Sequence, residues 1–293
     1  MALTEAQIAE RRTGVGASEV AAALGLSPYL TPLGLYQLKR GEAPPVAENL
    51  AMRFGTHNES FILGEFARKH PDFQIYAAPD TMRRGPMLAH LDAWVPRHAN
   101  VQIKTARSRD GWGDSGSPDV PMHYLLQVQA EMLLAKVRVS FIPVLFSGAD
   151  YDEFVVEADR DLQEMVEAGV VDFWRRVKEG DAPQPQTVDE AIERWGRKSL
   201  AESVTADAEV LAAVAVLREM KAHETEIERN KAVVMRALGE RDTLVDAKGR
   251  VLATWKAAAA PQRFDLDGFR AKHEALAKEF TKPGTPSRRF LLK

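Results

Sequence analysis

Residues 91–104 decide the fold, and they read LDAWVPRHANVQIK. Two strands joined by a hairpin would bring Asp92 to the same edge as residues 102 and 104, because side chains two apart on a strand share a face. Hard divalent ions prefer oxygen ligands, and the carbonyl of Ile103 adds one. A lysine such as Lys104 beside the ion could activate a water. The spacing predicts a metal-plus-lysine site, and a surface hairpin with scattered polar residues is the alternative.

The composition excludes several classes of protein. Lys and Arg number 39 against 42 Asp and Glu, which gives a net charge of −3, and 45% of the residues are hydrophobic. Such a chain can bury a core, so it is neither disordered nor collagen-like. With no cysteine, disulfide scaffolds and thiolate zinc sites are excluded. Without an apolar signal or a run of about 18 apolar residues, we expect a cytoplasmic protein with no membrane partner.

Hydrophobic periodicity and turn residues predict an α/β (α+β) fold with a mixed central sheet flanked by helices. Predicted helices cover 3–24 (broken by Gly14 and Gly16), 31–40, 48–69, 122–135 and 159–179. Predicted strands cover 73–77, 87–95, 100–105, 137–146 and 151–156.

Two prolines within 181–187 mark the best candidate boundary. We therefore predict a core with an N-terminal helical part at 1–182. An appendage at 183–293 would complete the same globule, with helices at 206–238 and 266–279 and a hairpin turned at 248–250. A basic tail with Arg288 and Arg289 follows.

Further polar residues precede and follow the 91–104 stretch. Glu59 lies on a predicted helix, where its carboxylate could complete the metal site. Tyr124 and Gln127 are about one turn apart on a later helix and could bind a phosphate or the attacking water. Arg11 and Ser18 flank a glycine-bearing turn and could hold a terminal phosphate. Each also has an ordinary structural interpretation, so their order along the chain carries more information than any one residue.

This ordered set of motifs resembles the YqaJ-type viral recombinase family, the lambda exonuclease family of phage alkaline exonucleases. The motifs that carry the resemblance are Gly16-Ala17-Ser18-Glu19-Val20, Ser27-Pro28-Tyr29, Gly55 to Glu59, Asp92 with Gln102-Ile103-Lys104, and Tyr124 with Gln127-Val128-Gln129. They cover about residues 10–160, and the region from about 205 onward resembles the C-terminal part of phage members.

The resemblance implies a restriction-endonuclease-like core with a D-x(n)-E-x-K metal site for Mg²⁺, or possible Mn²⁺. It implies a phage- or prophage-encoded homotrimer that digests one strand of double-stranded DNA 5′ to 3′, processively, from a free end. A single-strand annealing protein would be its recombination partner. By this resemblance Glu59, Asp92, residue 102 and the Ile103 carbonyl hold metal, and Lys104 helps to generate the nucleophile. Arg11, Ser18, His90 and Gln127 match positions that contact phosphate, although the family pattern leads us to expect a small hydroxyl residue at 90.

One departure from the family pattern is serious, because Gln102 stands where Glu or Asp is required. An amide oxygen can bind a divalent ion but brings no negative charge. Either this chain is catalytically impaired, or other carboxylates compensate, with Asp114 and Asp119 as candidates. Two functional alternatives follow: a catalytically silent DNA-end-binding module that recruits an annealing protein, and a structure-specific endonuclease.

The loop after Lys104 contains Arg107, Arg109 and Trp112 among Gly, Ser and Asp residues. One interpretation is a disordered surface loop. The other is a loop that binds DNA through aromatic stacking and cationic contacts.

Overall fold

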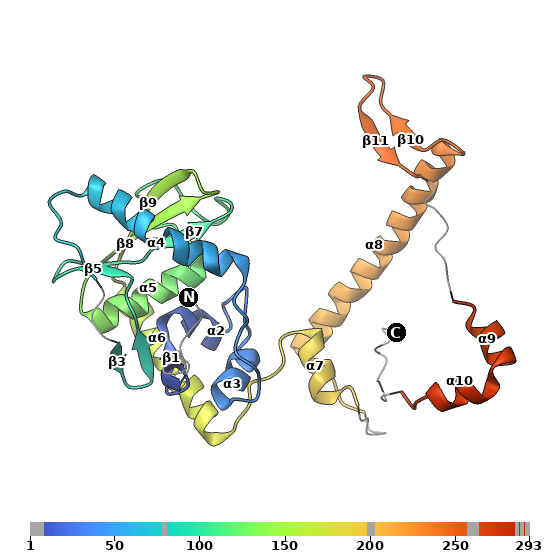
Figure 1. Cartoon of the computed structure of the whole chain (residues 1–293), viewed down its shortest axis with the longest axis horizontal. Coiled ribbons are helices and arrows are strands. Elements are labelled where there is room, and N and C mark those ends of the chain that lie inside the picture. The colour runs from blue at the N-terminus through green and yellow to red at the C-terminus, as the bar shows by residue number, and fades with distance from the viewer. Residues whose placement is uncertain are drawn as a thin grey trace. The chain divides into compact units, whose positions relative to one another are not determined.

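The computed structural model describes residues 9–77, 81–197, 203–256, 264–284, 287 and 290, so Arg288 and Arg289 lie outside the described residues. The chain divides into two compact units, Met1–Thr187 and Val188–Lys293 (Figure 1). The division falls close to the predicted boundary at 182/183. That the second part completes the same globule stays a prediction.

Helices of the first unit begin and end at residues whose side chains suit those positions. They are α2 (Val20–Ala23), which follows the short 3₁₀ turn η1 (Ala17–Glu19), α3 (Pro32–Arg40), α4 (Leu50–Lys69), α5 (Met122–Ala135) and α6 (Arg160–Glu179). The Thr31 hydroxyl caps α3 by accepting from the Gly34 amide at 3.0 Å, and Gly41 ends it with φ 72°. Asp159 and Gly180 do the same for α6. The helices predicted from 31, 48, 122 and 159 are confirmed within about two residues at each end.

The main sheet has six strands, β2 (Tyr76–Ala77), β5 (Ala93–Val95), β6 (Ala99–Val101), β7 (Lys104–Ala106), β8 (Val139–Phe146) and β9 (Asp150–Glu157). Strands β5 and β6 form the expected antiparallel hairpin, with Ala93 opposite Val101. Both β6 and β7 pair parallel with β8, and β9 pairs antiparallel with β8. The strand predicted at 100–105 is therefore two strands, interrupted at Gln102 and Ile103. At the interruption the backbone amide of Gln102 still donates to the Phe141 carbonyl at 2.9 Å.

A second, three-stranded sheet was not predicted, and it corrects two expectations. Its order is β1 (Val15–Gly16), β4 (Met87–Ala89) and β3 (Met82–Arg84), with β1 parallel to β4. The helix predicted over 3–24, broken by Gly14 and Gly16, needs one correction: the break contains a strand, β1, while residues 3–8 lie outside the described residues. Gly14 permits a close approach, because an added Cβ would lie 2.3 Å from the Pro86 carbonyl oxygen. The strand predicted at 87–95 is also wrong, since its two halves, β4 and β5, belong to different sheets.

Helix α5 joins the two cores of the first unit. Leu126 and Ala130 pack in the cluster formed with η1, α2, α3 and α6. Val128 and Met132 pack against Val144 and other side chains of β8 and β9. A helix buried on both faces is apolar around most of its circumference, so any polar side chain on α5 is placed inside the protein.

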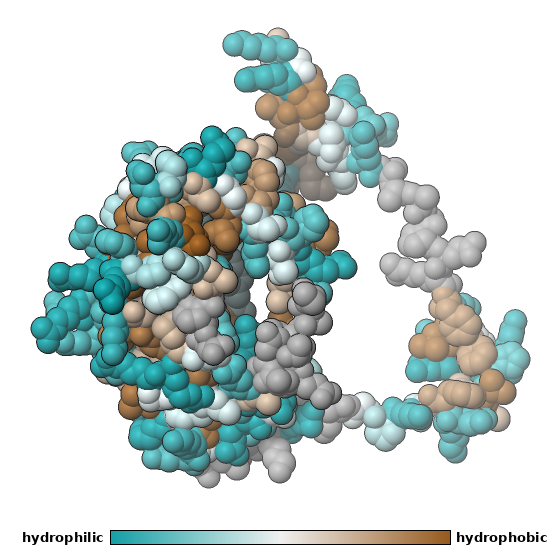
Figure 2. Space-filling model, turned by 60° about the vertical axis from the view of Figure 1, so that its left-hand side comes forward, coloured by the Kyte–Doolittle hydropathy of each residue, from teal (hydrophilic) through white to brown (hydrophobic). Residues whose placement is uncertain are grey.

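The second unit contains α7 (Val188–Trp195), α8 (Ala208–Leu238), the hairpin β10 (Thr243–Val245) and β11 (Val251–Thr254), α9 (Leu266–Lys272) and α10 (Glu274–Phe280). Helix α7 was not predicted. The long helix and the hairpin are confirmed. The single helix expected at 266–279 is wrong, because His273 leaves helical geometry with φ −134° and ψ 52°. Leu276 and Phe280, two large apolar side chains of α10, are exposed. Figure 2 shows hydrophobic residues (brown) at the surface among hydrophilic ones (teal).

Candidate active site

The interruption between β6 and β7 faces the residue that precedes β5. Asp92 Oδ2 accepts hydrogen bonds from the Gln102 side-chain amide at 2.5 Å and from the Ile103 backbone amide at 2.8 Å. The structure thus brings together Asp92, Gln102 and Ile103, as the sequence spacing predicted. It does so through the break in the strand, because a regular strand would commit the Ile103 amide to its neighbouring strand.

Lys104 is the first residue of β7, and its ammonium group lies against α5. Its Nζ donates to Gln127 Oε1 at 3.2 Å and lies 5.0 Å from the centre of the Tyr124 ring. Two neighbouring α5 side chains therefore hold the lysine, one through a hydrogen bond and one through a cation–π contact. Lys104, Tyr124 and Gln127 form one group, as the sequence led us to expect.

Carboxylates near Lys104 are in an environment that disfavours their charge. Burial raises the pKa of Asp92, while Lys104 and the two hydrogen bonds oppose that shift. Partial desolvation raises the pKa of Glu59 on α4, and repulsion from Asp92 adds to it. Glu59 is therefore close enough to Asp92 for the two carboxylates to interact.

A third acidic residue of the site, Glu131, was missed by the sequence analysis. Its side chain is fully buried on α5 and accepts from Gln127 Nε2 at 2.8 Å and from Asn100 Nδ2 at 2.7 Å. Asn100 also donates to Ser140 Oγ at 3.1 Å. Burial raises the pKa of Glu131 to about 8, an effect that Lys104 partly opposes. The available signal was a glutamate four residues after Gln127 within an apolar helix.

The candidate metal ligands are oxygen atoms, the type that a hard divalent cation prefers. They carry one negative charge fewer than the family pattern, which has Glu or Asp at position 102. Asp92, Glu59, the Ile103 carbonyl and the Gln102 amide supply only oxygen ligands. Within the described ranges, Gln102 Oε1 is buried with no hydrogen-bond partner, so this oxygen remains available as a metal ligand. The same part of the chain holds no cluster of three or more His, Cys, Asp or Glu side chains suited to a metal ion. The oxygen atoms present are of the type that Mg²⁺ or Mn²⁺ prefers, but an amide stands where a third carboxylate would strengthen a site.

Three of the four residues that the family resemblance predicts to contact phosphate lie on the N-terminal segment or beside it. Exposed Ser18 belongs to η1, which packs on α5. The Arg11 carbonyl accepts from Lys39 Nζ at 2.6 Å, which fixes its backbone and leaves the guanidinium at the surface. His90 follows β4 and lies 3.5 Å from a Glu10 carboxylate oxygen. Their roles on phosphate stay predictions.

The loop after β7 is ordered, contrary to the interpretation as a disordered loop. The Gly116 backbone amide donates to the Glu153 carbonyl of β9 at 2.7 Å, and the Val155 amide of β9 donates to the Ser117 carbonyl of the loop at 3.2 Å. Trp112 packs between Tyr124 and Phe154, with ring centres 5.5 and 4.8 Å away. Such packing favours a structural role for the tryptophan over base stacking.

The other polar residues of this loop are at the surface. Arg109 pairs with Asp152 at 2.6 Å and covers the Phe146 ring, whereas Arg107 lines a surface pocket beside Phe54. Asp114 and Asp119 are exposed, and their backbone carbonyls accept turn hydrogen bonds from Ser117 and Gly113. Glu131 is the buried acidic side chain that Gln127 contacts, but its raised pKa of about 8 favours the neutral form at pH 7, so it does not replace the charge that Gln102 lacks.

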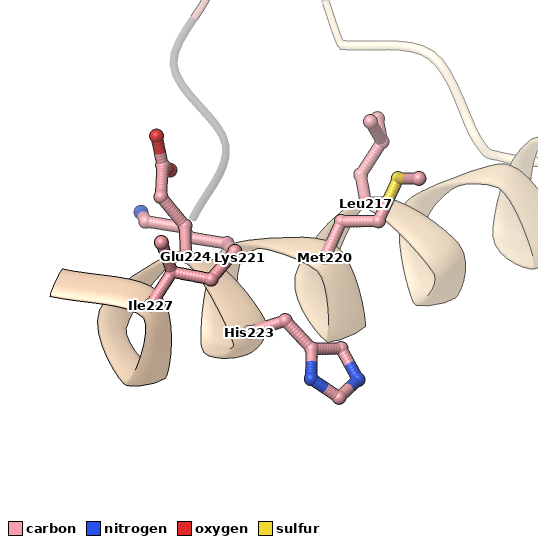
Figure 3. Close-up of a pocket in the computed structure, with 6 residues that line it drawn as sticks. All are labelled: Leu217, Met220, Lys221, His223, Glu224 and Ile227. Carbon is pink, nitrogen blue, oxygen red and sulfur yellow. The ribbon is translucent and has the colours of Figure 1, made fainter. Parts of the chain in front are cut away.

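A groove on α8 has a different character. Its lining, Leu217, Met220, Lys221, His223, Glu224 and Ile227, comes from one helix, and His223 points away from the others (Figure 3). A surface of this kind brings no convergent polar groups to a reacting atom. Among the described residues, no helix is long and apolar enough to cross a membrane.

The chain is similar in sequence to known proteins. Residues 8–138 match the family model of the YqaJ-like viral recombinase domain. The chain is 27% identical to the protein YqaJ of Bacillus subtilis (strain 168) over 214 residues, which are 66% of this chain and 62% of that relative. The chain thus spans less than two thirds of that relative's length.

Two solved structures align with part of the chain. The alkaline exonuclease LHK-Exo from Laribacter hongkongensis has a TM-score of 0.50 at 17% identity, covering 60% of this chain and 94% of that one. A phage related exonuclease from Haemophilus somnus 129PT has a TM-score of 0.45 at 11% identity, covering 57% and 95%. The first likeness shows a shared mixed α/β fold.

Proposed function

We propose that this chain, which carries a YqaJ-like viral recombinase domain, is an exodeoxyribonuclease acting on the ends of double-stranded DNA. The observation that carries the proposal is the placement of Lys104 between Asp92 and Gln127. Asp92 is held by the Ile103 amide at 2.8 Å, and Lys104 is held by Gln127 at 3.2 Å. The fold shared with an alkaline exonuclease supports the same reaction class.

The residues of the chain divide the work of phosphodiester hydrolysis. Lys104 places a positive charge where negative charge develops on the phosphate, and a preorganised charge of this kind lowers the barrier. Gln127 holds that ammonium group, and the Tyr124 ring limits its movement. Asp92, Glu59, Gln102 Oε1 and the Ile103 carbonyl would hold Mg²⁺ or Mn²⁺, which when bound polarises phosphate oxygens and lowers the pKa of water.

The finer features of the proposal concern the DNA end. Arg11 and Ser18, from the segment that contacts α5, would bind a terminal 5′-phosphate. Digestion would run 5′ to 3′ and processively, with a homotrimeric ring as the basis of processivity. A single-strand annealing protein would take the product in phage-type recombination, within the bacterial cytoplasm.

Gln102 supports a second candidate, a catalytically silent module that binds DNA ends and recruits the annealing protein. Its amide already satisfies one oxygen of Asp92 at 2.5 Å, which a metal ion would otherwise neutralise. The two candidates differ in whether the wild-type chain cleaves DNA, because both require binding to the duplex end.

A time course on linear duplex in Mg²⁺ and in Mn²⁺ tests the proposal, with wild-type, Gln102→Glu and Lys104→Ala chains compared. Loss of a 5′ strand with the wild-type chain supports the exonuclease. Cleavage by Gln102→Glu alone supports the silent module, and no cleavage by either contradicts the nuclease site. Undiminished cleavage in chelator would contradict the metal ligands.

Covalently closed duplex separates an exonuclease from a structure-specific endonuclease, since only the endonuclease would cut it. The mass of the particle in solution tests the ring. A trimer agrees with processive digestion, and a monomer removes its physical basis.

A further inference from the structure

Glu131 is a buried acidic residue that the proposed reaction does not use. It lies on α5, has no solvent-exposed surface, and both of its oxygens accept hydrogen bonds, from Gln127 and from Asn100. A buried carboxylate costs free energy unless it is well paired. Its presence at this position therefore calls for a function.

The hydrogen bond between Glu131 and Gln127 fixes which way the Gln127 amide faces. An amide has a donor end and an acceptor end, and a carboxylate oxygen accepts only from the donor end. Because Gln127 Nε2 donates to Glu131 at 2.8 Å, Oε1 of the same amide faces Lys104 and accepts from its Nζ at 3.2 Å. With the amide reversed, an NH₂ group would face the ammonium, and both would be donors.

Asn100 anchors the other oxygen of Glu131 to the sheet. Its amide donates both to Glu131 and to Ser140 on the neighbouring strand β8. Hydrogen bonds thus connect β8, β6, α5 and β7 in one series, which runs from Ser140 through Asn100, Glu131 and Gln127 to Lys104. A fully connected polar network of this kind specifies one arrangement of its members.

We propose that Glu131 is a positioning residue that orients the Gln127 amide so that its oxygen holds Lys104 in the reactive position. This role rests on the proposed nuclease function for its purpose and on the hydrogen bonds for its mechanism. Glu131 also places an acidic group near Lys104 in a chain whose residue 102 is neutral.

Two substitutions separate the parts of this role. Glu131→Met is similar in size and removes the acceptor, which frees the Gln127 amide to reverse. Glu131→Gln keeps an acceptor oxygen for Gln127, and its new NH₂ group can donate to Asn100 Oδ1, a buried atom with no partner among the described residues. The matched control is Glu153→Gln, since Glu153 pairs with His70 and Tyr151 on the face of β9 opposite Phe154 and α5.

The first measurement does not depend on cleavage. Hydrogen exchange of the Gln127 side-chain NH₂ group is followed by NMR with ¹⁵N-glutamine, and Gln127→Met identifies its resonance. We expect exchange about 10-fold faster in Glu131→Met, because a charge-assisted hydrogen bond is lost. Wild-type-like exchange is expected in Glu153→Gln and near-wild-type exchange in Glu131→Gln. Unchanged exchange in Glu131→Met would overturn the proposal.

The second measurement is a double-mutant cycle on the cleavage rate, with DNA affinity and the unfolding midpoint measured for each chain. We expect Glu131→Met to lower kcat about 10²-fold, as small misplacements of reacting groups do, with KM unchanged. Gln127→Met should cost a similar factor, and the double variant no more than either single one. Additive losses would show that Glu131 acts on packing alone and would overturn the proposal.

The two measurements distinguish failure of the inference from failure of the proposed function. If the wild-type chain fails to cleave DNA with either Mg²⁺ or Mn²⁺, that result contradicts the proposed nuclease function. The hydrogen-exchange experiment still decides the orientation of Gln127 in that case. If Glu131→Met does not fold, Glu131→Leu replaces it in both measurements with the same expected results.

Discussion

The two sides of the site differ in how their polar groups are paired. On the strand side, with Asp92, Gln102 and Ile103, the Gln102 side-chain oxygen is buried with no hydrogen-bond partner among the described residues. On the helix side, both ends of the Gln127 amide and both oxygens of Glu131 make hydrogen bonds. The helix side is closed by its own hydrogen bonds, which makes it rigid. The strand side keeps an unused acceptor beside a carboxylate, which suits a ligand the chain does not supply. The two sides thus combine a prebuilt holder for Lys104 with an open position for an ion.

The largest effect is expected where the two sides meet, at Lys104. Lys104→Ala should lower the rate of duplex digestion about 10³-fold, because it removes the charge that both sides position. Single-turnover digestion of a labelled linear duplex measures this, and Lys136→Ala, an exposed lysine at the end of α5, is the control. A Lys104→Ala chain that digests DNA at the wild-type rate would disprove the site.

The strand side should gain from a restored charge. Gln102→Glu is expected to raise the rate about 10²-fold at fixed Mg²⁺, since an anionic ligand favours binding of the ion. It should also increase the Mn²⁺-induced rise in unfolding temperature, which titration by calorimetric scanning measures without DNA. No change in either quantity would mean that the amide is already compensated.

The helix side should titrate with pH. The pKa of Glu131 is raised from 4.5 to about 8, so its protonated form is favoured in the folded state. The resulting stabilisation is present below pH 4.5 and is lost as the pH rises through 8. We expect the free energy of unfolding to fall by about 2 kcal/mol more in wild type than in Glu131→Gln between pH 5 and 8. Urea unfolding at both pH values measures this, and parallel curves would contradict the buried acid.

The N-terminal segment, outside both sides, should affect the choice of end. Arg11→Ala is expected to remove a preference for 5′-phosphorylated over 5′-hydroxyl ends of about 10-fold, the value of one charge-assisted hydrogen bond. Initial rates on matched duplexes measure the preference, with Arg138→Ala as the control. A wild-type chain that digests both ends equally would remove the reason for placing phosphate at Arg11.

The smallest effect is expected in the loop. Asp114→Asn should change the cleavage rate less than about 2-fold, because exposed carboxylates interact weakly through water. A large loss in the same digestion assay would show that Asp114 compensates for the charge that Gln102 lacks.

Much of the site followed from sequence because its parts are local. Asp92 and Gln102 belong to one hairpin, and Tyr124 and Gln127 to one helix turn, so strand and helix periodicity were enough to group them. The break between β6 and β7 could not be foreseen, since Asn100 to Thr105 alternates like a continuous strand. At the break the Ile103 amide donates to Asp92, whereas the pairing with β8 keeps one register on both sides.

Glu131 and Trp112 show why other roles were misjudged. Glu131 looks like a surface residue by its type, and Trp112 by its polar neighbours in the sequence. Only the packing of α5 against two hydrophobic clusters places Glu131 inside the protein and Trp112 against Phe154. The small sheet was missed for the same reason, because Val15 and Met87 pair across a long stretch of chain. Such contacts depend on tertiary structure, which local patterns do not encode.

The pairing of Lys104 with Val144 and of Val101 with Phe141 sets an order of assembly. A parallel pair needs a crossover, and here the crossover is α5 itself. During synthesis, the hairpin that carries Asp92 therefore waits for α5 and β8 to leave the ribosome before its partner strand exists. The proposed nuclease site would be assembled late, so a nascent chain that ends before about residue 146 carries the chemical groups without the geometry that brings them together.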